Sequence, residues 1–192
     1  MKKKEIANFF DGCAPFWDDD MIRNEEVIAT ILDKAAVKEG SHVLDIACGT
    51  GVLFPDYLDR NVASITGIDI SPEMVKIAQE KFPDIEVICG DAEKYPFQNQ
   101  FDVVMIYNAF PHFLNPSCLI EALSKLVKPG GKVSIAHGMS REALSKHHSG
   151  SARKVSIELL HETELATLLE PHFDVDVIIS NDQMYQVTGI KR

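Results

Sequence analysis

The sequence HVLDIACGTG, residues 42–51, decides the fold. Its first half is a short apolar run of the length of a buried strand, and its second half is a turn that holds Gly49 and Gly51. A glycine turn directly after a buried strand lets the main chain approach a ligand, because no Cβ stands in the way. The stretch therefore predicts a strand that ends at a binding site.

Short apolar runs alternate with helical patterns on both sides of this strand. Such alternation predicts a parallel sheet with helices on both faces. The last two apolar runs are separated only by residues 181–183, which is short enough for a hairpin. Strands are expected from residue 42 and near 64–70, 85–89, 101–107, 131–137, 173–179 and 184–190, and helices near 27–35, 54–59, 72–82, 119–127, 140–149 and 162–170.

Length, composition and charge indicate a folded protein that does not bind polyanions. The chain has 192 residues, of which 45% are hydrophobic and 25% charged, and no linker or repeat divides it, so we expect one domain over 1–192. Its 19 basic and 29 acidic residues give a net charge of −10. Such a field repels phosphate backbones and anionic membrane surfaces, so neither nucleic acid nor a membrane is expected as a partner.

The chain shows no sign of export. Its first residues lack the apolar stretch of a signal peptide, and no window approaches the roughly 18 apolar residues of a membrane span. The four cysteines, Cys13, Cys48, Cys89 and Cys118, include no C-x-x-C pair, which fits reduced thiols better than a disulfide framework or a zinc site. We therefore expect a cytoplasmic location.

Asp69 indicates which kind of ligand the sheet binds. It ends the second strand, twenty residues after Gly49, at the edge where ligands bind to open parallel sheets. A carboxylate there can accept hydrogen bonds from both vicinal hydroxyls of a ribose. A dinucleotide would require G-x-G-x-x-G, but the third glycine position is Phe54, and the chain has no P-loop motif. The pattern predicts a nucleoside ligand without phosphates and disfavours an NAD-linked oxidoreductase.

Five motifs in order carry a resemblance to a known family. VLDIACGTG, GIDIS, GDAEKYPF, FDVVMIYNAFPHF and VKPGG span Val43–Gly131. In this order the chain resembles the class I S-adenosylmethionine-dependent methyltransferases, and specifically the small-molecule, methyltransferase type 11-like branch. The resemblance implies an α/β fold: a single-domain, Rossmann-like doubly wound sheet of seven strands, mostly parallel with an antiparallel last strand. It also implies S-adenosyl-L-methionine as the cofactor.

The resemblance further implies a set of cofactor contacts. The first-strand loop would surround the methionyl part, Asp69 would take the ribose hydroxyls, and Asp91 would accept from the adenine amino group. The main chain around Tyr107 would lie beside the sulfonium. Ala47 departs from the family's D-x-G-x-G-x-G pattern, but its small side chain should not prevent binding. The expected cofactor-binding residues are Asp45, Ala47, Cys48, Gly49, Gly51, Asp69, Ile70, Asp91, Ala92, Tyr107 and Asn108.

The segment after the fourth strand bears on the acceptor. Residues 108–112 read NAFPH, whereas amino-directed DNA methyltransferases carry Asn/Asp-Pro-Pro-Tyr/Phe there. A cytosine-C5 enzyme would need a Pro-Cys nucleophile, and Pro116-Ser117-Cys118 has the wrong spacing. Together with the acidic charge, these departures favour a small-molecule acceptor over a nucleic acid.

Three segments are expected to build the acceptor pocket above a cofactor-binding core at 43–137. Residues 1–23 would form an N-terminal lid with Phe9, Phe10, Phe16 and Trp17, although simple packing on the core explains these aromatic residues nearly as well. The turn after the fourth strand contributes Tyr107 and His112. Residues 138–157 would form a substrate cap with Arg141, His147 and His148.

His112, His137 and Tyr107 are the catalytic candidates. Both histidines fall at or just beyond the strand ends where the cofactor is expected, so either could deprotonate or orient the acceptor, while structural hydrogen bonding is the alternative. His137 with His147 and His148 also permits a zinc-like site, but adjacent residues of a helix do not share a face, so no metal site is assigned.

The sequence thus predicts an enzyme that transfers a methyl group to a small molecule by in-line displacement. The alternative is an inactive protein that binds S-adenosylmethionine or S-adenosylhomocysteine as a sensor or assembly partner. Both would bind the cofactor, so only turnover separates them. The acceptor atom and the oligomeric state are left open.

Overall fold

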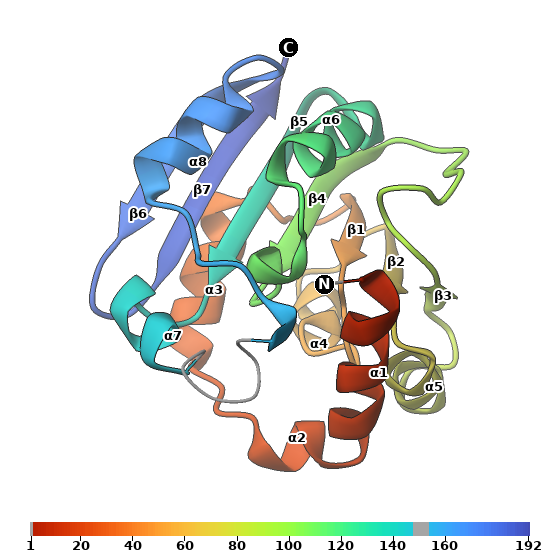
Figure 1. The fold of residues 1–192 in the computed structure, drawn as a ribbon. Coiled ribbons are helices and arrows are strands. Elements are labelled where there is room, and N and C mark those ends of the chain that lie inside the picture. Colours follow the sequence, from red (N-terminus) through yellow and green to blue (C-terminus); the bar gives the residue numbers. More distant parts are fainter. Residues whose placement is uncertain (1, 148–153) are drawn as a thin grey trace.

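The computed structural model describes residues 2–147 and 154–192, and it has one seven-stranded sheet in the order β3-β2-β1-β4-β5-β7-β6 (Figure 1). Neighbours from β3 to β5 pair in parallel, whereas β7 is antiparallel to both β5 and β6. The predicted fold class is therefore confirmed. The strands are β1 (His42–Ile46), β2 (Ser64–Asp69), β3 (Glu86–Cys89), β4 (Phe101–Tyr107), β5 (Val127–His137), β6 (Phe173–Ser180) and β7 (Tyr185–Lys191).

Helices cover both faces of the sheet, and each face has its own apolar core. One core joins the sheet to α6 (Pro116–Leu126) and α8 (Glu162–Leu169). The other joins it to α3 (Glu25–Lys34), α4 (Phe54–Asp59) and α5 (Pro72–Lys81). The shorter helix α7 (Arg141–His147) follows β5. The predicted order of strands and helices agrees with this arrangement.

Two boundary residues show how the sequence starts the helices at the functional edge. The Ser71 hydroxyl accepts a hydrogen bond from the Met74 N–H, and Pro72 occupies the first turn of α5, where no N–H is needed. The Asn115 side chain caps α6 in the same way. Ser71 lies two residues after the end of β2, whereas Asn115 follows the loop and 3-10 turn after β4, and each fixes where its helix begins.

The N-terminal segment contains regular helices that the sequence analysis did not predict. It forms α1 (Lys3–Cys13), a 3-10 turn (Ala14–Phe16) and the short α2 (Trp17–Asp20). Figure 1 shows α1 beside α5, outside the layers that sandwich the sheet. Ile6 is the buried residue of α1, so the helix packs on the domain mainly through the face that carries Ile6.

The fifth strand begins at Val127 instead of near the expected residue 131, because it continues through Pro129, Gly130 and Gly131. Phe101 pairs with Val127 and Val103 pairs with Lys132, so the intervening residues bulge out of the ladder. Gly130 has φ 77°, a left-handed conformation that glycine adopts without a Cβ clash.

In the described part of the chain, no helix is long and apolar enough to cross a membrane.

Candidate functional site

A cavity of about 160 Å³ lies at the carboxyl ends of β1 to β4, beside the point between β1 and β4 where the strand order reverses. The α1–α2 region covers its outer side. Among the expected cofactor residues, ten line it: Asp45, Ala47, Cys48, Gly49, Asp69, Ile70, Asp91, Ala92, Tyr107 and Asn108. The structure thus brings together residues from four strand ends.

Asp45, in β1, is a buried carboxyl at the floor of the cavity. Burial raises its pKa to about 8, the neighbouring Tyr57 hydroxyl opposes this shift, and the charge of Asp69 adds to it. The site therefore holds a carboxyl that is partly protonated near neutral pH. A cationic ligand would favour its ionised form.

The turn after β1 explains why the family pattern prefers glycine. Ala47 has φ 56° and Gly49 has φ 57°, so both residues are in the left-handed region. Gly51 lies outside the cavity lining. A Cβ on Gly51 would be 2.7 Å from Phe54 Cδ2 and 2.9 Å from Phe82 Cε2. Gly51 thus permits the close packing of this turn on two aromatic rings.

Two backbone amides hold Asp69 in place. Its Oδ2 accepts a hydrogen bond from the Gly49 N–H and its Oδ1 from the Ser71 N–H, both at 2.9 Å. Burial raises the pKa of Asp69, and these amides oppose the shift. A carboxylate oxygen carries two lone pairs, so each can accept a further bond from a ligand. This geometry suits a pair of neighbouring hydroxyls.

Asp91 follows β3 and forms an ion pair that the sequence analysis missed. Lys3 Nζ lies 2.7 Å from Asp91 Oδ1, and it also contacts Glu93. Lys3 and Glu93 line the cavity as well. The basic run at residues 2–4 is visible in the sequence, but nothing local indicates a partner 88 positions away.

The N-terminal segment supplies an apolar wall of the cavity. Ile6, Phe10, Trp17 and Met21 line it, whereas Phe9 does not and Phe16 is 63% exposed. Of the four predicted lid residues, Phe10 and Trp17 therefore lie at the cavity, whereas Phe9 and Phe16 do not.

Hydrogen bonds tie this segment to the loops that carry the candidate cofactor residues. Asp11 accepts from the Ser71 hydroxyl and Asp18 from the Thr50 hydroxyl, each at 2.5 Å. Lys81 Nζ adds an ion pair to Asp18 at 2.7 Å. With Lys3, these contacts connect the segment to the turns after β1, β2 and β3.

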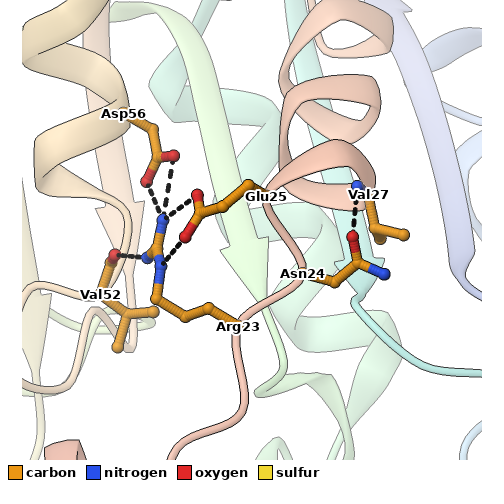
Figure 2. Close-up of polar contacts among 6 residues, drawn as sticks. All are labelled: Arg23, Asn24, Glu25, Val27, Val52 and Asp56. Carbon is orange, nitrogen blue, oxygen red and sulfur yellow. Dashed lines mark hydrogen bonds and ion pairs between the residues drawn. The ribbon is translucent and has the colours of Figure 1, made fainter.

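Arg23 anchors the end of the N-terminal segment, as Figure 2 shows. Its guanidinium binds Glu25 through two nitrogens, contacts Asp56 in α4 and donates to the carbonyl of Val52. Asn24 then caps α3 by accepting from the Val27 N–H at 3.2 Å. Since Val52 lines the cavity, the anchor reaches the cavity wall directly.

Tyr107 and Asn108 connect β4 to the end of β5. Asn108 Oδ1 accepts a hydrogen bond from the Gly138 N–H at 2.9 Å, and a Cβ on Gly138 would lie 2.3 Å from the Tyr107 hydroxyl. Burial raises the pKa of Tyr107. The phenol therefore stays protonated at neutral pH and is a hydrogen-bond donor, not a base.

His112 lines the cavity and lies where two other segments meet. Its ring is edge-on to Phe10 with centroids 4.8 Å apart, and Nδ1 lies 3.0 Å from the Val155 carbonyl. A carbonyl only accepts hydrogen bonds, so Nδ1 is the donor in this contact.

The structure does not bring His137 to the cavity. Its side chain is fully buried at the end of β5 and lies against the Tyr185 ring, with centroids 6.0 Å apart. The side chain of His147 and the whole of His148 lie outside the described residues, as does 148–153 of the expected cap. The described cap residues do not line the cavity, and Arg141 begins α7. Among the described side chains, no group of three or more His, Cys, Asp or Glu is placed to hold a metal ion.

The sequence of this chain matches a known protein family. Residues 43–131 match the family model described as a methyltransferase domain. The chain is 34% identical over 138 residues to the demethylmenaquinone methyltransferase of Paenarthrobacter aurescens, covering 69% of this chain and 54% of that protein. It is 26% identical over 147 residues to the ubiquinone biosynthesis O-methyltransferase of Coxiella burnetii, covering 68% and 60%. The chain thus spans little more than half the length of these relatives.

Solved structures with the same fold include two with bound S-adenosylhomocysteine. The N-methyltransferase NodS of Bradyrhizobium japonicum has a TM-score of 0.75 at 13% identity, and the match covers 100% of this chain and 99% of that one. The magnesium protoporphyrin IX methyltransferase ChlM of Synechocystis has a TM-score of 0.73 at 17% identity, with 99% of both chains covered. At these identities the likeness is one of fold.

Proposed function

Because the chain belongs to the class I S-adenosylmethionine-dependent methyltransferase superfamily, we propose that it binds S-adenosylmethionine and methylates a small molecule. One observation carries this proposal: Asp45, Asp69 and Asp91, at the ends of three successive strands, line a single cavity. The oxygens of three carboxyls suit a ligand with hydroxyl, amino and cationic groups. Bound S-adenosylmethionine would supply an activated methyl group.

The chain's own residues fit the parts of this cofactor. Asp69 has a lone pair on each oxygen for a vicinal diol, and Gly49 leaves room for close approach. The α1–α2 region covers the site and would exclude water during transfer. Because the N-terminal segment lines the cavity, we expect it to move outward when the cofactor enters.

The apolar part of the cavity supports a flat aromatic acceptor. Phe10, Trp17, Tyr107 and Phe113 line it, and aromatic rings pack well edge to face against such side chains. The relatives described above are named for demethylmenaquinone and ubiquinone biosynthesis. We therefore assign a hydroxylated aromatic ring of the quinone-precursor type as the acceptor class.

His112 is the proton acceptor in this proposal. A phenolic acceptor must lose its proton before or during attack on the methyl group. His112 lines the cavity and its Nδ1 donates to the Val155 carbonyl, so Nε2 is the nitrogen that would take the proton. His137, which lies outside the cavity lining, has no place in the step.

Binding and turnover test the proposal separately. Calorimetry should show binding of S-adenosylhomocysteine and none of NAD, and Asp69→Ala should weaken it by about 1.5–3 kcal/mol, the range for hydrogen bonds to a charged group. Methyl transfer to quinone-precursor phenols should then be lost in His112→Ala with cofactor affinity kept. Binding without turnover on any acceptor would support the inactive sensor instead, and binding of NAD alone would reject the cofactor assignment.

A further inference from the structure

Lys3 places its ammonium group between two carboxylates of the turn after β3. Nζ lies 2.7 Å from both Oδ1 and Oδ2 of Asp91, and it also contacts Glu93. The Asp91 and Glu93 side chains are 22% and 11% exposed, so this is a half-buried cluster and not a loose surface pair. All three residues line the candidate cofactor cavity.

The contacts of Asp91 leave it one acceptor position. Oδ1 accepts from Lys3 and from the Glu93 N–H, the latter at 3.2 Å. Oδ2 has only Lys3 among the contacts in the described part of the chain. Since a carboxylate oxygen carries two lone pairs, Oδ2 can accept one more hydrogen bond.

The ammonium also sets the direction of this carboxylate. Asp91 and Glu93 are like charges two residues apart, and they would repel each other without a cation between them. Lys3 satisfies both and fixes the Asp91 plane through two contacts. The helix α1 thereby orients Asp91, a hydrogen-bond acceptor at the edge of the sheet.

We propose that Lys3 is a positioning residue for base recognition: it orients Asp91 so that Oδ2 accepts from the amino group of the cofactor's purine, which makes this recognition depend on α1. The inference rests on the proposed function and deepens it. Lys3 does not react with the cofactor or the acceptor, because its role is exercised through Asp91.

Two ligands that differ by one amino group provide the test. They are S-adenosylhomocysteine and its 6-deamino analogue, in which hydrogen replaces the purine amino group. A site that hydrogen-bonds this group should bind S-adenosylhomocysteine at least about tenfold more tightly, since the analogue leaves Oδ2 unpaired. In Lys3→Met, which keeps most of the side-chain length without the charge, this ratio should fall below about threefold. Lys3→Arg should restore most of it.

Lys81→Met is the matched control. Lys81 also ties the N-terminal segment to the domain, through Asp18, but it is remote from Asp91 in this contact network. The variant should weaken both ligands by the same factor and leave the ratio unchanged. Amide exchange gives a second readout, because S-adenosylhomocysteine should slow exchange in α1 more strongly in the wild type than in Lys3→Met.

Each other outcome overturns the inference. If Lys3→Met weakens both ligands equally, Lys3 only closes the segment, and the proposed function stands. Tighter binding of S-adenosylhomocysteine by the variant would show that Lys3 competes with the base. A wild-type protein that binds neither ligand rejects the proposed function together with this inference. If urea unfolding shows that Lys3→Met does not fold, Lys3→Gln, which also removes the charge that holds both Asp91 oxygens, must lower the ratio instead.

Discussion

Asp45 shows how burial sets the protonation state of a single side chain in the candidate ligand site. Its carboxyl is buried at the carboxyl end of β1, where burial raises its pKa to about 8. A raised pKa means that the folded protein holds this proton more tightly than the unfolded chain, in which Asp titrates near about 3.9. The neutral form is therefore the stable one in the empty site.

Stability should consequently depend on pH through Asp45. Its contribution to the free energy of unfolding is fully present below about pH 4 and is lost as the pH rises through the folded pKa of about 8. Asp45→Asn stays neutral, so its stability relative to the wild type should increase from pH 5 to pH 8.5 in urea unfolding without ligand. Asp59→Asn, at an exposed position of α4, is the control. An equal difference at both pH values would contradict the assignment.

Ala47 carries backbone strain that can be measured. A non-glycine residue in the left-handed region costs about 1–2 kcal/mol, partly offset because alanine restricts the unfolded chain more than glycine does. With φ 56° at this position, Ala47→Gly should raise the free energy of unfolding by up to about 1 kcal/mol. Ala35→Gly, at φ −73° at the end of α3, should lower it. A destabilised Ala47→Gly protein would show that the methyl group contributes more by packing than its backbone costs.

Among the elements, those defined by local patterns could be predicted from the sequence and those that depend on distant partners could not. All seven strands follow from apolar runs, and α5 and α6 from periodicity and their proline starts. The helix α1 was missed because its stability comes from Ile6, Phe10 and Lys3 against turns far along the chain. The start of β5 was expected four residues too late, because proline and glycine are typical of turns and here form a bulge within the strand.

The same contrast applies to the candidate site. Asp69 could be predicted as part of a cavity because it ends a parallel strand, and such ends meet at one edge. His137 also ends a strand, but its side chain points into the layer beside Tyr185. Sequence position gives the edge of the sheet, while the face on which a side chain lies depends on the exact end of the strand and on its neighbours.

The junction between α2 and α3 is an element-scale test of the Arg23 anchor. A lysine has one ammonium and cannot reproduce the planar fork that reaches Glu25, Asp56 and the Val52 carbonyl together (Figure 2). Arg23→Lys should lower the free energy of unfolding by about 1 kcal/mol, since the site is partly exposed. Urea unfolding measures this, with Arg192→Lys at the more exposed end of the chain as the control. Equal stabilities would show that a point charge suffices.

At the scale of the whole molecule, three turns of the sheet edge are tied to one N-terminal segment. The same segment lines the cavity beneath it, through Lys3, Ile6, Phe10 and Trp17. We therefore expect entry and exit of the ligand to be coupled to movement of the segment.

This coupling predicts gated association. In stopped-flow mixing, the observed rate of S-adenosylhomocysteine binding should level off at high ligand concentration, where opening of the segment becomes limiting. Lys81→Met, which removes the ion pair to Asp18, should raise the plateau. Higher salt should raise it as well, because the pair is partly exposed and is screened. A rate that rises linearly throughout, in both proteins, would mean that the segment does not limit entry.

The antiparallel direction of β7 has a practical consequence for attaching the molecule to a surface or a reporter. Because β7 runs against its neighbour β5, it carries the chain from the cavity edge to the opposite edge of the sheet. Arg192 follows it there, whereas Lys3 lies in the cavity lining. A dye or immobilisation tether joined after Arg192 would leave the ligand entrance clear. The same group joined before Lys3 would sit at the entrance and disturb ligand binding itself.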